Sequence, residues 1–186
     1  MAFVKIEIRG DKAASKYLGG FGAPEQSIYR AINKGVAKAK TETWNTVKVG
    51  FPIKQSQLYK SIYTKKAGPF SLSGWLKAYP RKWTYLEVGG ATELKKGVKV
   101  QPRKGIRKTA IGAIVGSSRR GGKEYVWVPK KHGQYGLEVA QTFSAAQMLD
   151  DPPGSMQGNL RKVQQAAADA YEKELLRQID LIAART

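Results

Sequence analysis

The sequence predicts an α+β fold in which a long N-terminal helix and a C-terminal helix pack on an antiparallel β-sheet. Residues 24–48 and 157–184 carry apolar side chains at near-helical spacing, whereas the segment between them contains short runs of alternating apolar and polar residues. Glycine and proline separate nearly all of these runs, as an antiparallel meander requires. We expect residues 1–186 to form a single α+β domain.

The N-terminal part is expected to contain one strand and the first long helix. Residues 3–8 alternate apolar and charged side chains, which predicts a strand. Pro24 suits the first turn of a helix, because its missing N–H would have no partner there. Apolar residues then recur on one helical face as far as Val47, and Gly50 and Pro52 end the pattern.

The middle of the chain is predicted to be mainly β-structure. A short amphipathic helix or turn is expected over 53–62, before the strands begin. The candidate strands are 72–79, 83–88, 97–100, 110–115 and 124–128. The sequence DDPPG at 150–154 then breaks the chain, and the final helix follows at about 157–184.

The net charge of +19 is the most unusual property of the composition. Residues 1–149 contain 28 Lys and Arg against 8 Asp and Glu, while residues 150–186 contain 5 against 6. Such a field favours a polyanionic partner and opposes self-association unless the charge is screened. The basic part of the chain therefore predicts contact with a polyanion or with acidic protein neighbours.

Two sets of cations are candidates for such contacts. Arg30, Lys34 and Lys38 recur every fourth residue and would form one positive stripe on the first helix. Residues 91–123 are rich in Gly, Lys and Arg and are expected to form an exposed basic arm, without aromatic rings that could stack on bases. The candidate phosphate-facing residues are Arg30, Lys34, Lys38, Lys95, Lys96, Lys99, Arg103, Lys104, Arg107, Lys108, Arg119, Arg120 and Lys123. A phosphate backbone and acidic protein faces fit them equally.

Composition also limits the class of protein. A hydrophobic fraction of 41% and an aromatic fraction of 10% favour a folded chain over a disordered one. No apolar run approaches the ~18 residues that span a bilayer, and the first residues, MAFVKIEIRGDK, contain no signal-peptide core. The sequence has no cysteine, which excludes disulfides, thiolate metal sites and cysteine nucleophiles.

Candidates for catalytic chemistry are few. His132 is the only histidine and is expected to lie in a basic surface loop. Asp150 and Asp151 precede two prolines and fit a turn better than a metal site, since no third ligand is near. The glycine-rich stretch 116–123 fails the P-loop pattern, because Glu124 stands where Ser or Thr would hold magnesium. We therefore expect no enzymatic activity, no metal and no cofactor.

Several short phrases follow one another in a fixed order along the chain. AINKGVAKAKT at 31–41 combines "A-x-N", small and basic residues and "A-x-T". The strand phrases after it are LSGWLKA at 72–78, GVKV at 97–100, GAIV at 112–115 and EYVWVP at 124–129. In this order, over roughly residues 28–182, the chain resembles the phage minor tail protein Z (tail completion) family and the related tail-component family of long-tailed phages. Ile114 and Pro129 depart from the family's usual phenylalanine and arginine, which affects docking surfaces more than the general role.

The resemblance implies a structural subunit at the head-proximal end of a phage tail, needed for head–tail joining and DNA passage. It implies a homo-oligomeric ring, sixfold in the family's geometry, whose partners are other tail and head–tail connector subunits. Genomic DNA would be a non-specific partner, and a membrane would not be one. The protein would be found in the tail neck of the virion, and in the host cytoplasm during assembly.

Two other function classes compete with this hypothesis. A sequence-independent nucleic-acid-binding protein outside a virion would fit the composition, but the sequence contains no helix-turn-helix, zinc or RNA-binding motif. A small nuclease would need a cluster of Asp, Glu and His that the sequence does not offer. The structural subunit is therefore the leading hypothesis.

Overall fold

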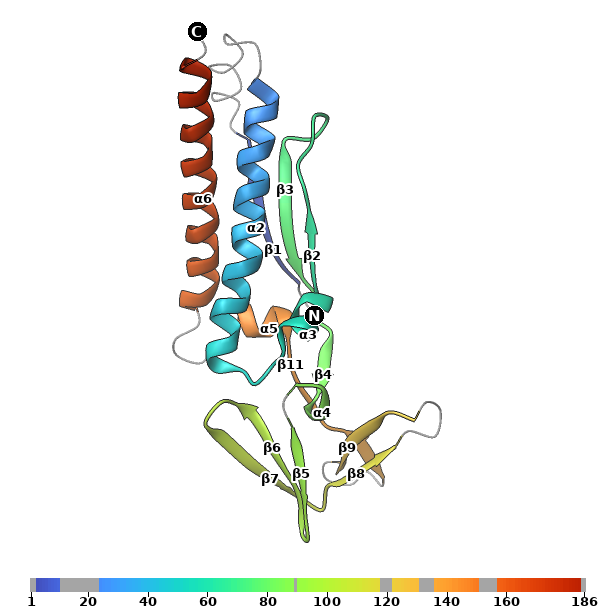
Figure 1. The fold of residues 1–186 in the computed structure, drawn as a ribbon. Helices are drawn as coiled ribbons and strands as arrows, with labels where there is room; N and C mark the ends of the chain where they lie inside the picture. Colours follow the sequence, from blue (N-terminus) through green and yellow to red (C-terminus); the bar gives the residue numbers. More distant parts are fainter. Residues whose placement is uncertain are drawn as a thin grey trace.

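The computed structural model shows an α+β protein and so confirms the predicted class. It describes residues 3–10, 24–88, 90–117, 122–130, 136–150 and 157–184. Two long helices and a three-stranded sheet form one end of the molecule, and smaller β-sheets form the other end (Figure 1). Short elements between the two ends connect them.

The two long helices begin and end close to their predicted limits. Helix α2 spans Pro24–Gly50 and helix α6 spans Gln157–Ala183. They run antiparallel side by side along most of their lengths (Figure 1). Ile28, Ile32 and Val36 of α2 are buried in a cluster against which α6 packs. The residues of α6 in this contact are Tyr171, Leu175, Ile179 and Ile182.

A three-stranded antiparallel sheet packs against these helices. Its strands are β1 (Val4–Arg9), β2 (Ile62–Lys65) and β3 (Ser73–Ala78), in the order β1-β3-β2. Ile6 pairs with Leu76, and both are buried on the helix-facing side. Because side chains alternate along a strand, the intervening residues point to the other side of the sheet.

The remaining elements form the middle and the far end of the molecule. The helices are α3 (Gln55–Lys60), α4 (Tyr85–Val88) and α5 (Ala145–Asp150). The strands are β4 (Lys82–Thr84), β5 (Ala91–Leu94), β6 (Gly97–Arg103), β7 (Ile106–Ile111), β8 (Ile114–Ser117), β9 (Glu124–Pro129), β10 (Leu137–Val139) and β11 (Gln141–Ser144). They pair as β5-β6-β7, β10-β9-β8 and β11-β4. Buried Val98, Val100, Ala113 and Val126 form the core of this end.

The predicted strand 83–88 is only partly correct, because helix α4 replaces its last four residues. The backbone N–H of Glu87 donates to Thr84 Oγ1 at 3.3 Å, and the N–H of Thr84 donates to Glu87 Oε2 at 3.0 Å. This reciprocal pair is a capping box, which satisfies N–H groups at a helix start. The local hydrogen bonds therefore begin a helix where the alternation predicted a strand.

The strands do not join into one sheet. The predicted strand 110–115 is divided at Gly112, whose φ of +72° suits a turn, into the end of β7 and the start of β8. The predicted basic arm, 91–123, is folded for most of its length as β5, β6, β7 and β8. Its valines, Val98 and Val100, are buried. The described part of the segment 91–123 thus forms a small β-structure that contributes buried side chains to a hydrophobic core.

Candidate nucleic-acid interface

Helix α2 presents the predicted positive stripe at its surface. Arg30, Lys34 and Lys38 are all exposed, and Lys38 Nζ lies 4.0 Å from Glu42 Oε2. Arg30 and Lys34 border a surface groove between α2 and α6. The carboxylates that line this groove are Asp169, Glu172, Glu174 and Asp180. Carboxylates of the same chain therefore lie beside this stripe.

The carboxylate of Glu174 in this groove already has partners in the same chain. Its carboxylate accepts hydrogen bonds from Arg177 Nη2 and Gln178 Nε2, each at 2.7 Å. These bonds lower the pKa of Glu174 to about 2, with a smaller contribution from the positive charge of Lys34. The carboxylates of the groove thus partly balance the positive field of the α2 stripe within the molecule.

The second basic set surrounds the β5-β6-β7 sheet. We call its exposed or partly exposed members the β6–β7 basic surface. They are Lys95, Lys96, Lys99, Lys104, Arg107 and Lys108. Lys95 and Lys96 lie in the turn between β5 and β6, and Lys104 lies in the turn between β6 and β7. Strand β7 is exposed along most of its length and has one unpaired edge. Cations thus occupy both ends of the sheet and its open edge.

Arg103 has a different environment from its neighbours. Its guanidinium carbon lies 5.6 Å from the ring centre of Phe51 and 5.3 Å from that of Phe143. The backbone N–H of Lys104 donates to the carbonyl oxygen of Gly50 at 3.0 Å. These contacts attach the β6–β7 turn to the end of α2. Arg103 therefore holds the hairpin in place, and we do not count it in the β6–β7 basic surface.

Four of the single residues named as candidates from the sequence lie outside the described part of the chain. They are Arg119, Arg120, His132 and Asp151. Lys123 is exposed and borders a shallow groove that also contains Arg81 and Lys82. The eleven candidate cations in the described part of the chain are therefore spread over α2, the β5-β6-β7 sheet and this groove, and they lie on separate elements.

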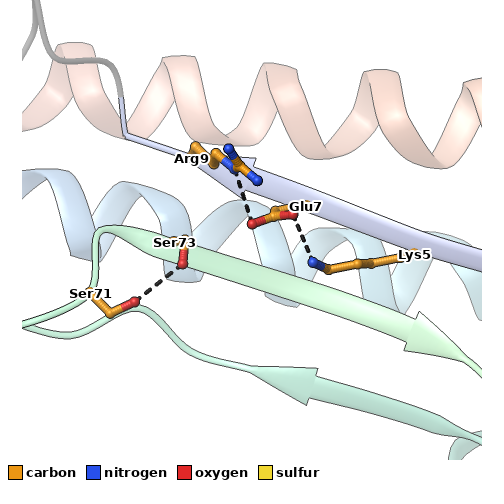
Figure 2. A network of polar contacts seen from close by, with 5 residues as sticks. All are labelled: Lys5, Glu7, Arg9, Ser71 and Ser73. Atoms are coloured by element: carbon orange, nitrogen blue, oxygen red, sulfur yellow. Dashed lines mark hydrogen bonds and ion pairs between the residues drawn. The ribbon is translucent and has the colours of Figure 1, made fainter.

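A further surface was not predicted as a site. On the side of the β1-β3-β2 sheet away from the helices, Glu7 lies between Lys5 and Arg9 (Figure 2). Its carboxylate is 2.8 Å from Lys5 Nζ and 3.1 Å from Arg9 Nε. Hydrogen bonds from Arg9 and then Lys5 lower the pKa of Glu7 to about 2. Nearby, the hydroxyl of Ser73 at the start of β3 lies 3.2 Å from that of Ser71 in the preceding turn (Figure 2).

Aromatic rings lie among these charges. Trp75 pairs with Glu7 and with Lys65, and Lys77 pairs with Lys5 and with Tyr63. We define the outer sheet face as Phe3, Lys5, Glu7, Arg9, Tyr63, Lys65, Trp75, Lys77 and Tyr79. The alternation over 72–79 indicated that Trp75 and Tyr79 share a face. Only the strand pairing brings the side chains of β1 and β2 beside them.

The rings of the outer sheet face contact one another and the cations. Tyr63 and Tyr79 are packed edge to face with ring centres 4.9 Å apart. Lys77 Nζ lies 3.7 Å from the ring centre of Phe3 and 5.2 Å from that of Tyr79. Phe3 and Tyr63 remain about half exposed, at 50% and 55%. The face therefore offers accessible rings with lysines close beside them.

Among the described residues, no group of three or more His, Cys, Asp and Glu side chains is placed to hold a metal ion. The lowered pKa values of Glu7 and Glu174 arise from surface hydrogen bonds and ion pairs, and burial raises the pKa of Tyr85.

None of the helices described is long and apolar enough to cross a membrane.

Comparison with protein-family models, curated proteins and solved structures finds no match.

Proposed function

We propose that the chain is a non-catalytic structural subunit of a phage tail. In this proposal it sits at the head-proximal end and completes the tail for head–tail joining and DNA passage. Its partners are tail and connector subunits, copies of itself in a ring, and genomic DNA. The observation that carries the proposal is the β6–β7 basic surface, whose exposed cations extend around both ends of a small sheet.

The phrases that resemble the tail completion family support the proposal, since each falls on a defined element or at its start. AINKGVAKAKT lies within α2, and GAIV includes the turn at Gly112 that leads into β8. LSGWLKA, GVKV and EYVWVP correspond to β3, β6 and β9. The resemblance is thus distributed over the helices and both β-regions, as expected if it reflects a shared fold.

The physical role of the β6–β7 basic surface follows from its charge. Lysine and arginine contacts to phosphate release counterions and need no particular base sequence. In a ring around a DNA channel, such residues would attract the DNA backbone without fixing its position. A subunit that lets DNA pass needs this kind of contact.

Duplex DNA binding at several salt concentrations tests this role. The variant has serine at five exposed positions and retains Arg103, which holds the hairpin. These positions are Lys95, Lys96, Lys104, Arg107 and Lys108. The slope of log affinity against log salt should become flatter by about 0.9 for each DNA phosphate that the variant no longer neutralises.

The matched control is a Lys34→Ser, Lys38→Ser variant on α2, where carboxylates lie nearby. This control should change the slope less per substitution. An unchanged slope in the five-serine variant, with the fold intact by circular dichroism, would show that the β6–β7 basic surface does not contact DNA.

A further inference from the structure

We propose that the outer sheet face binds single-stranded nucleic acid without regard to base sequence. This site is separate from the β6–β7 basic surface and does not depend on the proposed function. Three strands contribute to the face, with the two long helices packed on the opposite side of the sheet. The face is thus open over β2 and β3, whereas at the β1 edge Lys5, Glu7 and Arg9 border a groove that α6 also lines.

The arrangement of side chains supports this ligand. Each strand places at least one cation on the face, with Lys5 and Arg9 on β1, Lys65 on β2 and Lys77 on β3. The rings come from residues on or next to the same three strands. Neighbouring strands lie about 4.8 Å apart, so rings and cations alternate at distances a few ångströms apart. Bases can stack on the rings while the lysines contact phosphates.

The net charge of the face is positive although it contains a carboxylate. Glu7 is held between Lys5 and Arg9, so its charge is matched locally. The ammonium groups of Lys65 and Lys77 then remain to attract an anion, and Lys77 already lies against Phe3 and Tyr79. A phosphate beside Lys77 would bring a neighbouring base close to these rings.

A single strand suits this face better than the other polyanions. The bases of a duplex are stacked on one another, so a duplex could use the cations but not the rings. An acidic polypeptide would likewise pair with the lysines and gain little specific stacking from four aromatic side chains. Because every base has an aromatic face, a flexible strand can occupy the rings in any sequence.

The test uses the full chain and an oligothymidylate of about ten nucleotides. Binding is followed by quenching of tryptophan fluorescence, because Trp75 lies at the centre of the face. We expect tighter binding of this strand than of a duplex of equal length. Trp75→Phe should remove most of the quenching; with binding followed instead by the anisotropy of a labelled oligothymidylate, its affinity should stay within about twofold, since phenylalanine still stacks.

Substitutions separate stacking from charge. Tyr63→Ala removes an exposed ring and should weaken oligothymidylate binding about tenfold, with unchanged duplex binding. Phe70→Ala, which removes a fully exposed ring from the hairpin turn outside the face, should have no effect. The five-serine variant should lose duplex affinity and retain the preference for the single strand.

Three outcomes would overturn this inference. The first is equal affinity for single strand and duplex in the five-serine variant, in which the cations of the β6–β7 basic surface no longer contribute to duplex binding. The second is unchanged single-strand affinity in Tyr63→Ala. The third is displacement of the oligothymidylate by polyglutamate of the same charge at the same concentration, which would indicate a docking surface for an acidic protein. None of these results bears on the five-serine duplex experiment, so the two proposals fail independently.

Discussion

At the scale of single residues, the basic protein uses its few carboxylates to organise cations. Glu7 accepts hydrogen bonds from Lys5 and Arg9 on one strand, and Glu174 accepts hydrogen bonds from Arg177 and Gln178 on α6. Both pKa values are lowered to about 2, which means that the charged form is favoured in the folded protein. Each carboxylate therefore fixes the positions of neighbouring side chains.

Glu7 should make stability depend on pH in acid. A carboxyl with a lowered folded-state pKa stabilises the protein above its unfolded pKa, here about 4.5, and this stabilisation is lost as the pH falls toward about 2. Urea unfolding of the wild type and of Glu7→Gln should thus differ at pH 6 and converge by pH 2. The effect should be small and should shrink in high salt, because the pair is solvent-exposed. A difference that stays constant from pH 6 to pH 2 would contradict this assignment.

Gly35 is required where α2 approaches both α6 and β1. A Cβ at this position would lie 2.7 Å from Ile8 Cδ1 and 2.9 Å from the backbone oxygen of Ala167. Overpacking of this kind costs about 1–3 kcal/mol, and the better helix propensity of alanine offsets about 0.5–1 kcal/mol. We expect Gly35→Ala to lower the free energy of unfolding by about 1–2 kcal/mol in chemical denaturation. The control is Gly68→Ala, where a Cβ meets no atom within 4 Å; equal stability of the two variants would refute the close approach.

At the scale of elements, hydrogen bonds between side chains and the backbone at helix starts determine that α4 and α5 are helices, where alternating side chains alone did not separate helix from strand. Thr84 and Glu87 cap α4, and Ser144 and Gln147 form the same reciprocal pair at α5. Both pairs fit the sequence pattern of Ser or Thr followed three residues later by Glu or Gln. The two short helices were therefore readable from the sequence, but alternating side chains around Trp83 favoured a strand.

The attachment of the β6–β7 hairpin to α2 gives Arg103 a role in stability. Arg103→Ala removes a cation that lies beside two packed rings, an interaction of about 0.5–2 kcal/mol. We expect the midpoint of thermal unfolding to fall, while the salt dependence of DNA binding changes less than in Lys108→Ser. Unchanged stability together with a flatter slope of log affinity against log salt would instead indicate that Arg103 contacts DNA.

At the scale of the whole molecule, local signals were readable and distant pairings were not. Helical periodicity bounded by Pro24 and Gly50 predicted α2 closely, because these signals lie within the helix itself. No sequence signal within these segments indicates that residues 82–84 pair with 141–144, or that the described strands form four separate sheets. The same limit applies to the binding surfaces. The sequence locates the cations along the chain, but only the fold places carboxylates of α6 beside Lys34 and the ring of Phe3 beside Lys77.

The most direct test of the proposed function is electron microscopy of phage virions, in which the proposal places the chain at the head-proximal end of the tail. Wild-type particles are compared with particles made with the five-serine variant. We expect the chain to occupy the head-proximal end of the tail in both, and only the variant particles to hold or deliver DNA poorly. A position that is filled in the wild type but empty in the variant would show that the basic residues dock onto protein neighbours and not onto DNA. A head-proximal position that lacks the chain in wild-type particles would contradict the proposed function.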